Sequence, residues 1–491
     1  MRLRQLWAAA LVAGFFVTVG AADEERKEES AALRPSEKTA LAEIDRRAEE
    51  LREVNKAIWN FAEVGLQEHR SSALLVEKLR QGGFEVKTGV SDMPTAFVAS
   101  YGSGKPVIGI LAEYDALPGL SQKVSPTRDP VKEGAPGHAC GHSGLGTGAL
   151  GAVLAVKAAM EKHNLPGTIR LYGTPAEETL IGKVYMLLDG QFDDLDLCLH
   201  WHPADKNGVW AGSSKAAVSV KFTFKGTAAH AAGSPDRGRS ALDAVELMNV
   251  GVNYLREHVK ADARLHYVIT DGGGAPNVVP ASATVWYYIR ADRHQDVEEY
   301  FGWVQDIARG AALMTRTSMS LHVDTDCHEL IPNDELSEVI FTALKRVGPP
   351  QFTTEEKELA RRLQAPLVEE FGNRFPVPLN EDLVPLSTVE TSRGSTDVGD
   401  VSWYVPTSGL RTACFPAGSP GHSWQNVAGI GSTIGEKGID VAARVLALAA
   451  LDLLENPERV SAASAEWKER MKGREYKTLI PKGQKPPKEI R

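Results

Sequence analysis

The middle of the chain, residues 216–324, carries a pattern that restricts the possible folds more than any other feature. Its periodicity predicts, in order, strand, helix, strand, strand, helix and strand, at 216–224, 240–258, 265–270, 283–291, 296–314 and 318–324. That order is the split βαβ arrangement of a ferredoxin-like unit. Because such a unit is self-contained, we expect residues 213–326 to form a separate α+β domain inserted in the chain.

The segments on either side of this unit predict a different class of fold. Strand patterns at 84–90, 95–101, 107–111, 168–172 and 195–202 alternate with helical patterns at 36–58, 72–81 and 144–162, which indicates an α/β sheet with partly parallel strands. Helical patterns resume at 334–371, with a break at Pro349-Pro350, and at 441–454. We therefore expect a two-domain α/β protein whose mixed-sheet domain is built from residues 36–212 and 327–465.

Both ends of the chain differ in composition from the rest. Arg2 and Arg4 precede an apolar run at 6–19, and small residues at 20–22 suit a signal-peptide cleavage site. The apolar run is shorter than the roughly 20 residues that a membrane span needs. We expect export to the periplasm or outside the cell after cleavage at about residue 22, with an uncleaved anchor as the alternative. The tail at 466–491 is Lys- and Pro-rich beyond Tyr476, which predicts disorder.

Charge and cysteine content narrow the classes of partner. The formal net charge of −9 favours solubility and argues against a nucleic-acid partner, which would require a basic face. The four cysteines are far apart and follow no small-domain disulfide spacing; they are Cys140, Cys198, Cys327 and Cys414. An exported protein can pair its cysteines, but the sequence leaves open which of them, if any, form a disulfide.

The run Gly-His-Ala-Cys-Gly-His at 137–142 is the strongest chemical signal in the chain. Thiolate and imidazole are natural ligands of zinc and similar metals. If the backbone there is extended, Cys140 and His142 point the same way. A helix that begins at about Gly144 would also favour the thiolate form of Cys140. The alternative is a loop with a buried cysteine and a surface histidine.

Further carboxylates and imidazoles follow strands or lie in loops. The carboxyl ends of strands in open sheets are where α/β sites form. A metal-activated water beside a carboxylate base is a hydrolytic centre, so these residues are candidates for one site. The alternatives are a solvated acidic turn and histidines bonded to backbone. The candidates are Glu113, Asp115, Glu177, Glu178, His200, His202 and His422.

The predicted insert contains two more polar runs. His230 lies among small residues at 226–232, and Asn277 lies in a Gly- and Pro-rich turn at 272–280. Small residues allow another surface to approach closely. Simple turn chemistry is the alternative explanation of both runs.

Taken together, these motifs resemble the zinc peptidase and amidohydrolase family that includes aminoacylases, carboxypeptidase G and the plant auxin-conjugate hydrolases. The resemblance covers nearly all of residues 36–454. Its motifs occur in the family's order: Gly-His-Ala-Cys-Gly-His, Pro-Ala-Glu-Glu, Trp-His-Pro, Ala-His-Ala-Ala, Pro-Asn-Val-Val-Pro, Gly-Ser-Thr-Asp-Val-Gly-Asp-Val-Ser and Pro-Gly-His-Ser.

The resemblance implies a zinc-peptidase-like catalytic domain with two divalent metal ions, zinc or manganese. It implies that Cys140 bridges both ions, where other branches of the family use Asp. The other implied ligands are His142, Glu178, His202 and His422. His202 matches the family spacing, which leaves His200 and His138 as supporting residues. Ser143 is a departure, since related proteins often have Asp or Asn there, and it leaves open how His142 is held.

The resemblance also implies roles outside the ligand set. Glu177 would be the general base that activates the water and then protonates the leaving amine. The ferredoxin-like insert resembles the family's dimerisation or lid domain. From there His230 would reach into the site of a partner subunit and stabilise the oxyanion. Asn277 and Arg290 would bind the substrate, Arg290 as a carboxylate clamp.

We therefore expect a metal-dependent amidohydrolase that cleaves the amide bond of an N-acyl or N-aroyl amino acid, such as a p-aminobenzoyl-glutamate-like substrate. We expect a homodimer, with a heteromer containing a related subunit as the alternative. Two other functions stay open: a dipeptidase of the same family, and a catalytically silent metal-binding subunit. The presence of Glu177 and of all five implied ligands argues against the silent subunit.

Overall fold

A computed structural model of the chain describes residues 32–372, 374–387 and 392–488. The predicted signal sequence at 1–22 lies outside the described residues. Within the described part, the chain forms a mixed α/β fold with one seven-stranded and one four-stranded sheet. The predicted α/β class is confirmed.

The seven-stranded sheet has the order β1-β2-β4-β3-β5-β11-β6. Its strands are β1 (Glu85–Thr88), β2 (Phe97–Ser103), β3 (Val107–Ala112), β4 (Gly167–Gly173), β5 (Leu197–Ala204), β6 (Gly208–Trp210) and β11 (Thr407–Ala413). Strands β4, β3, β5 and β11 are mutually parallel, and the outer pairings are antiparallel. The carboxyl ends of the four central strands therefore meet at one edge of the sheet, where the candidate site residues follow them.

Ten helices accompany this sheet in the described residues. They are α1 (Pro35–Phe61), α2 (His69–Gln81), α3 (His142–His163), α4 (Gly182–Leu188), α7 (Asp334–Val347), α8 (Thr354–Phe371), α9 (Val398–Ser402), α10 (Trp424–Ile430), α11 (Thr433–Glu455) and α12 (Pro457–Arg470). Helix α3 packs against α1 and α11 and over β3, β4 and β5. Of the described helices, α3 alone is long and apolar enough to cross a membrane, and 89% of that stretch is buried inside the protein, as in the core helix of a soluble domain.

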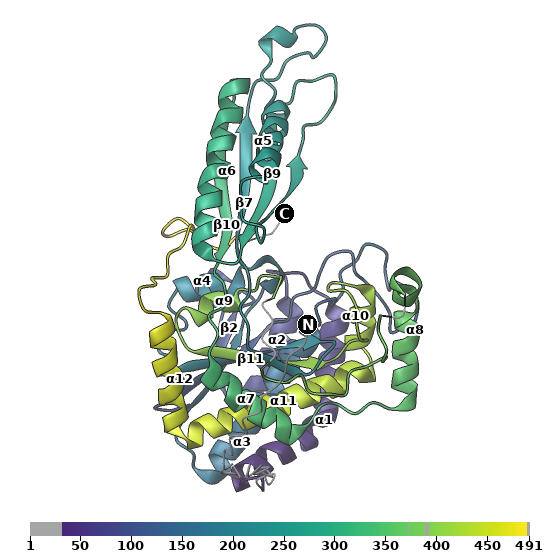
Figure 1. Cartoon of the computed structure of the whole chain (residues 1–491), viewed down its shortest axis with the longest axis vertical. Coiled ribbons are helices and arrows are strands. Elements are labelled where there is room, and N and C mark those ends of the chain that lie inside the picture. The colour runs from purple at the N-terminus through teal and green to yellow at the C-terminus, as the bar shows by residue number, and fades with distance from the viewer. Residues whose placement is uncertain (1–31, 373, 388–391, 489–491) are drawn as a thin grey trace, which may run out of the picture. The chain divides into compact units, whose positions relative to one another are not determined.

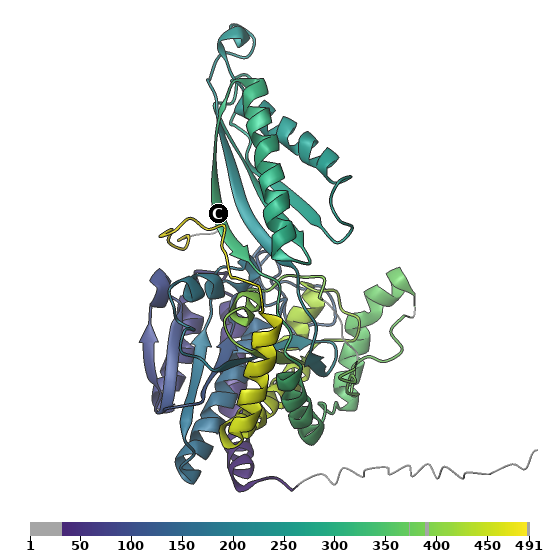
Figure 2. The ribbon, with the colours of Figure 1, turned by 60° about the vertical axis from the view of Figure 1, so that its left-hand side comes forward.

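The four-stranded sheet and its two helices are formed by residues of the predicted insert. The elements follow one another as β7 (Ala216–Lys225), α5 (Ala241–Leu255), β8 (Arg264–Asp271), β9 (Ser282–Ala291), α6 (His294–Thr315) and β10 (Ser318–Cys327). The sheet is antiparallel, with the order β10-β7-β9-β8. Helices α5 and α6 lie on the same side of it in both ribbon views (Figures 1 and 2). The structure thus has the predicted element order, which is that of a split βαβ unit.

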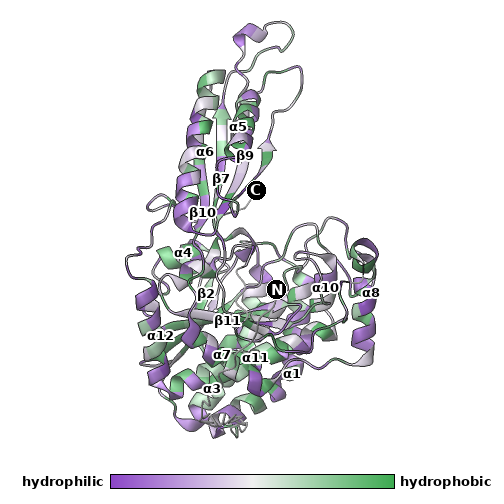
Figure 3. Cartoon of the chain, in the orientation of Figure 1, coloured by the Kyte–Doolittle hydropathy of each residue, from purple (hydrophilic) through white to green (hydrophobic). Residues whose placement is uncertain are grey.

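The alternation of buried and partly exposed residues along the strands explains why both helices lie on one side of the four-stranded sheet. Along β9, every second residue is buried and its neighbours are only partly covered. One face of the sheet therefore packs under the helices, as a period of two requires. Hydrophobic and hydrophilic residues are mixed along α6 for the same reason, because one side of the helix packs on the sheet and the other meets solvent (Figure 3).

The expectation of a disordered tail is wrong for the residues that the structure describes, which extend to Lys488. Helix α12 runs through the predicted start of the tail at 466. Beyond it, the Tyr476 ring stacks on His328, and Ile480 is buried. The amide of Gln484 donates to the hydroxyl of Tyr185 and to the backbone of Val323. These local contacts hold a segment whose composition alone predicts disorder.

Candidate metal centre

The loop that carries Cys140 and His142 is fixed by a left-handed residue and by close packing. Gly141 has a φ of 87°, a conformation that favours glycine, and α3 begins directly after it at His142. Farther along α3, Gly148 lies against the ring of Trp201, where a Cβ atom would come within 2.8 Å. The Trp201 indole donates to the Leu145 carbonyl at 2.9 Å. This packing holds the start of α3 against β5, the strand that carries His202.

One detail of the sequence interpretation is wrong here. The backbone between the two ligands is not extended; α3 begins at His142, close to the expected start at about Gly144. The expected effect of the helix dipole on Cys140 is also overridden. Burial, together with the nearby Glu178 carboxylate, raises the pKa of the Cys140 thiol. A bound cation would be needed to favour the thiolate at this position.

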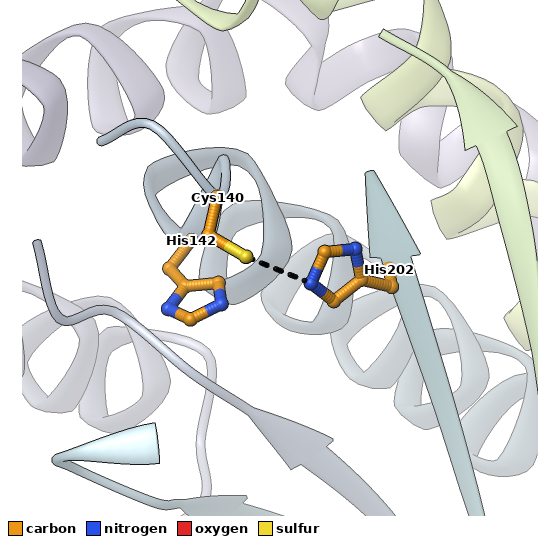
Figure 4. Close-up of side chains that lie close together, drawn as sticks. All are labelled: Cys140, His142 and His202. Carbon is orange, nitrogen blue, oxygen red and sulfur yellow. Dashed lines mark hydrogen bonds between the residues drawn. The ribbon is translucent and has the colours of Figure 1, made fainter. Parts of the chain in front are cut away.

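The first group of potential ligands consists of Cys140, His142 and His202. Their ligand atoms all lie within 4.8 Å of one another. Cys140 Sγ is 3.2 Å from His202 Nε2, and the His142 ring lies beside that pair (Figure 4). Burial is the main cause that lowers the pKa of His202 to about 4, so its imidazole is neutral at physiological pH and suited to bind a metal.

The second group consists of Cys140, Glu178 and His422, again within 4.8 Å of one another. Glu178 Oε2 lies 3.3 Å from His422 Nε2. His422 comes from the loop after β11 and is about half exposed, whereas Glu178 is nearly buried. Because Cys140 belongs to both groups, the arrangement suits two neighbouring ions that share one sulfur ligand.

Glu177 and Glu178 lie in a short, constrained turn, η2 (Glu177–Thr179). Ala176 before it and Leu180 after it both have positive φ, of 56° and 60°, which is uncommon for residues with a side chain. The buried carboxylate of Glu68 accepts the Ala176 backbone N–H at 2.8 Å and so stabilises the turn. The two carboxylates approach different nitrogens of the His142 ring: Glu177 Oε2 lies 3.9 Å from Nε2, and Glu178 Oε1 lies 4.0 Å from Nδ1.

His142 is held by Asp115, which answers the question that Ser143 raised. The Nδ1 atom of His142 lies 2.8 Å from Asp115 Oδ1, and both side chains are fully buried. The other oxygen of Asp115 accepts the backbone N–H of Glu178 at 2.9 Å. One carboxylate thereby positions a potential ligand from each of the two groups.

The site contains more buried acidic groups than buried cations. Besides Cys140 they are Glu113, Asp115, Glu177, Glu178 and Asp397, around the single buried amine of Lys183. Burial and repulsion from Glu113 raise the pKa of Glu177 well above its usual value. Burial and the neighbouring carboxylates raise the pKa of Glu178 to about 8. Without further positive charge these groups cannot all ionise together.

The donor set fits divalent metal ions. Within the clusters of potential metal ligands, three buried atoms lack any hydrogen-bond partner: Glu113 Oε2, His142 Nε2 and Glu178 Oε1. Orphaned polar atoms of this kind are costly unless something binds them. Thiolate, imidazole and carboxylate are the ligands that zinc and its neighbours accept, and two ions would balance the excess acidic charge.

Two predicted supporting histidines lie outside these groups. The Nε2 atom of His138 lies 3.0 Å from the Ile58 carbonyl of α1, so this residue ties the loop to a helix. His200 is buried, with its ring against Gly409 and Trp210. Burial lowers the pKa of His200 to about 3. Among the described residues, neither histidine belongs to a cluster of potential metal ligands.

The residues predicted in the insert lie in two places. His230 is exposed, and its Nδ1 accepts N–H groups of Ala232 and Gly233, which leaves Nε2 to carry the proton and donate. Asn277 is its neighbour, because the Asn277 carbonyl accepts the Ala231 N–H. His230 belongs to none of the clusters of potential metal ligands in the described part of the chain.

Arg290 is different, since it lies close enough to His422 to influence its charge. Burial is the main cause that lowers the pKa of His422, and the charges of His142 and Arg290 lower it further. The Arg290 guanidinium stacks over Tyr288, and its Nε is buried without a partner. The charge of Arg290 therefore acts on one residue of the metal centre.

Sequence reasoning missed three residues that organise the site. Glu68 carried no sequence signal at all. Lys183 is the one charged residue in α4, an otherwise apolar or aromatic helix just after the Glu-Glu pair, and this isolation was a usable signal. Asp397 lies in the quoted Gly-Ser-Thr-Asp motif, but no role was assigned to it; it accepts both the backbone N–H and the amine of Lys183.

The chain is similar to known proteins over most of its length. The profile of Peptidase family M20/M25/M40 matches residues 109–450. The chain is 39% identical over 454 residues to one of the subunits of the p-aminobenzoyl-glutamate hydrolase of Escherichia coli (strain K12), and the match covers 87% of this chain and 94% of that protein. It is 28% identical over 453 residues to the Xaa-Arg dipeptidase of Mus musculus, and this match covers 89% of this chain and 94% of that protein.

A solved structure with the same fold is a dinuclear metal binding peptidase of the M20 family from Bacillus subtilis. The superposition has a TM-score of 0.56 at 18% identity and covers 84% of this chain and 99% of that one. At this identity the likeness supports the fold, and the chemistry rests on the residues described above.

Proposed function

This chain belongs to peptidase family M20/M25/M40 and is a hydrolase of amide or peptide bonds, and from that premise we propose that it hydrolyses the amide bond of an N-acyl or N-aroyl amino acid. A p-aminobenzoyl-glutamate-like substrate is the proposed type, because the relative that is 39% identical is named for it. The sharing of Cys140 between two ligand groups, with Glu177 beside them, is the observation that carries the proposal.

The proposed cofactors are two divalent ions, zinc or manganese. Cys140, His142 and His202 would hold one, and Cys140, Glu178 and His422 the other. Such ions, when bound, polarise the substrate carbonyl and acidify a water molecule. Both metals accept this mixture of ligands, so the ligand set does not select between them.

Within the proposed mechanism, each remaining residue has a distinct task. Glu177 takes the proton from the attacking water at its carboxylate and later gives it to the leaving amine nitrogen. Its raised pKa suits a group that must both accept and donate a proton near neutrality. Arg290 would bind the carboxylate of the amino-acid part. His230 would donate from Nε2 to the developing oxyanion.

The test is a substrate panel on purified protein with added zinc or manganese. We expect release of the free amine from p-aminobenzoyl-glutamate and from N-benzoyl amino acids, at rates that fall when the metal is removed by a chelator. Metal-loaded protein that binds two ions but hydrolyses none of these compounds would contradict the proposed substrate class.

A dipeptidase is the second candidate, favoured by the similarity to the Xaa-Arg dipeptidase over 89% of this chain. The two candidates differ in the group on the carbonyl side of the cleaved bond, which is a simple acyl or aroyl group in one case and an amino acid with a free amine in the other. Adding Xaa-Arg and Xaa-Glu dipeptides to the same panel therefore separates them by the ratio of kcat/KM values.

We also propose that the insert forms a homodimer interface, with a heteromer as the alternative because the 39% identical relative is named as a subunit. Large apolar side chains are exposed on α5, α6 and β8, which supports an interface there. They include Leu247, Val250, Tyr254, Val268, Ile269 and Leu313.

Light scattering measures the mass in solution, and mixing two inactive variants tests whether the sites are shared. If His230 acts in a partner's site, Glu177→Gln and His230→Ala chains form mixed dimers with one intact site. Activity then returns on mixing. A monomeric mass, or no recovery after subunit exchange, would remove the dimer from the proposal.

Export remains a separate proposal that rests on residues 1–22 alone. Mass spectrometry of the protein made in a bacterial host, from separated periplasmic and cytoplasmic fractions, tests it. We expect a mature chain that begins near residue 23. A full-length chain held in the membrane fraction would favour the anchor.

A further inference from the structure

Glu113 lies at the metal centre but belongs to neither ligand group of the proposed function. It follows β3 directly and is 3% exposed. Its Oε1 atom is 2.7 Å from the Lys183 amine. Its Oε2 atom is buried without a hydrogen-bond partner and lies 3.3 Å from His142 Nε2. The Glu113, His142 and Glu177 ligand atoms lie within 4.8 Å of one another.

The contact between Glu113 and His142 brings two electron-pair donors together. Asp115 occupies His142 Nδ1 at 2.8 Å and so fixes the proton of a neutral ring on that nitrogen. The opposite nitrogen, Nε2, then presents a lone pair, as does Glu113 Oε2. Both atoms are buried and without a partner. Two such atoms repel each other unless a proton on His142 or a metal ion lies between them.

The spacing of the two atoms suits ligands of one ion. Two ligands that each lie about 2.1 Å from a tetrahedral ion are themselves about 3.4 Å apart. The observed 3.3 Å between Glu113 Oε2 and His142 Nε2 matches that spacing.

Lys183 explains why Glu113 presents only one oxygen to the site. The Lys183 side chain is fully buried and also binds Asp397, which is likewise fully buried. Asp397 further accepts the Lys183 backbone N–H at 2.9 Å, which fixes the start of α4. Lys183 supplies one positive charge to two carboxylates, Glu113 and Asp397, so one negative charge of the three groups is left for another cation.

We propose that Glu113 is a further ligand of the metal centre, binding through Oε2 the ion that Cys140, His142 and His202 hold. This inference rests on the proposed two-ion function and adds a fourth protein ligand to one of the two ions. Lys183 and Asp397 are positioning residues, since they act through Glu113 and not on the ion itself.

The experiment measures metal binding rather than turnover. Bound metal per chain and the two dissociation constants are determined by chelator competition for zinc and for cobalt(II), whose absorption reports the thiolate ligand. Glu113→Gln keeps an oxygen that can accept from Lys183 but removes the charged ligand. Glu113→Asp keeps the charge but withdraws it by one methylene from His142.

We expect both variants to weaken one ion at least tenfold and to leave the other unchanged. His202→Ala and His422→Ala serve as references, because each removes a ligand of only one ion and so identifies which ion is lost. The matched control is Glu37→Gln, another fully buried carboxylate, whose oxygens already accept from Arg34 and Arg346 and which belongs to none of the clusters of potential metal ligands in the described residues. The control is expected to retain both ions.

Two results would overturn the inference. If both Glu113 variants bind two ions with wild-type affinity, Glu113 is not a ligand. If Glu113→Asp binds normally and only Glu113→Gln is weakened, Glu113 supplies charge and not coordination. Should Glu113→Gln fail to fold, Glu113→Asp still decides, because it preserves the ion pair with Lys183. Wild-type protein that binds fewer than two ions would instead contradict the proposed function.

Discussion

Asp115 accepts a hydrogen bond from His142 through one oxygen, at 2.8 Å, and from the backbone N–H of Glu178 through the other, at 2.9 Å. Burial opposes its charge, but the interaction with His142 lowers the pKa of Asp115, so the carboxylate stays ionised. Since His142 and Glu178 belong to different ligand groups, this one side chain links the geometry of both ions.

Replacement of Asp115 by Asn tests this link. The variant keeps the shape of the side chain but loses the charge that orients the His142 ring and makes it more basic. We expect metal affinity to fall about 10- to 100-fold, as for other residues that support metal ligands. Chelator competition measures the effect. An unchanged affinity for both ions would show that Asp115 only stabilises the fold.

Cys140 is the ligand shared by both groups, so its replacement tests whether the two ions are bridged. In Cys140→Ser the hydroxyl is a much weaker ligand than a thiolate. We expect the occupancy of both ions to fall together, as measured by metal analysis after dialysis. Loss of one ion with the other retained at full affinity would contradict the bridge.

Replacement of Glu177 by Gln tests the assignment of the general base separately from metal binding. Glu177→Gln is nearly isosteric and cannot take a proton from water. We expect kcat to fall about 100- to 10,000-fold with two ions still bound. Steady-state kinetics and metal analysis of the same sample measure both effects. Near-normal turnover would remove Glu177 from the proposed role.

The helices and strands between Ala216 and Cys327 could be predicted from sequence because they are stabilised locally. Each of them shows a clear period, and the structure begins and ends them within a few residues of the predicted bounds. By contrast β11, which lies between β5 and β6, was not predicted. Its sequence, Thr-Ser-Gly-Leu-Arg-Thr-Ala, has little apolar character, and it becomes a strand because β5 and β6 pair with it.

At the candidate site, too, features marked by a local sequence pattern could be predicted, and features that depend on distant contacts could not. Cys140, His142, Glu178, His202 and His422 are marked by residue type and motif, and the structure brings all of them together. Lys183 and Glu68 act through contacts with residues 70 or more positions away, such as Glu113 and Ala176. No pattern along the chain reports such a contact. The left-handed Gly141 likewise depends on the loop that surrounds it, and so the expected extended backbone was wrong.

The contacts of Tyr476 in the C-terminal tail are expected to contribute to the stability of the folded chain. The Tyr476 hydroxyl donates to Asp400 at 2.9 Å, and the ring stacks on His328. Tyr476→Phe keeps the ring and removes a hydrogen bond to a charged group, so we expect a loss of about 1.5–3 kcal/mol in the free energy of unfolding. Urea denaturation measures it. Tyr254→Phe, at a site 71% exposed, is the matched control and should change little.

The pairing of His294 with Asp326 predicts that the free energy of unfolding depends on pH. Burial opposes its charged form, but the hydrogen bond and charge of Asp326 outweigh burial and raise the pKa of His294 above 6.5. The other groups that face it are Glu298, Glu329, Asp400 and the stacked ring of His328. Because the pKa is higher in the folded chain than in the unfolded chain, protonation of His294 favours folding.

This stabilisation is complete below the unfolded pKa of about 6.5 and is lost as the pH rises through the higher pKa of the folded state. We therefore expect the stability advantage of the wild type over His294→Gln to be larger at about pH 6 than at about pH 9. Urea denaturation at several pH values measures the difference, and His258→Gln, an exposed histidine, is the control. An advantage that stays constant across this range would mean that His294 acts through packing against His328 rather than through its charge.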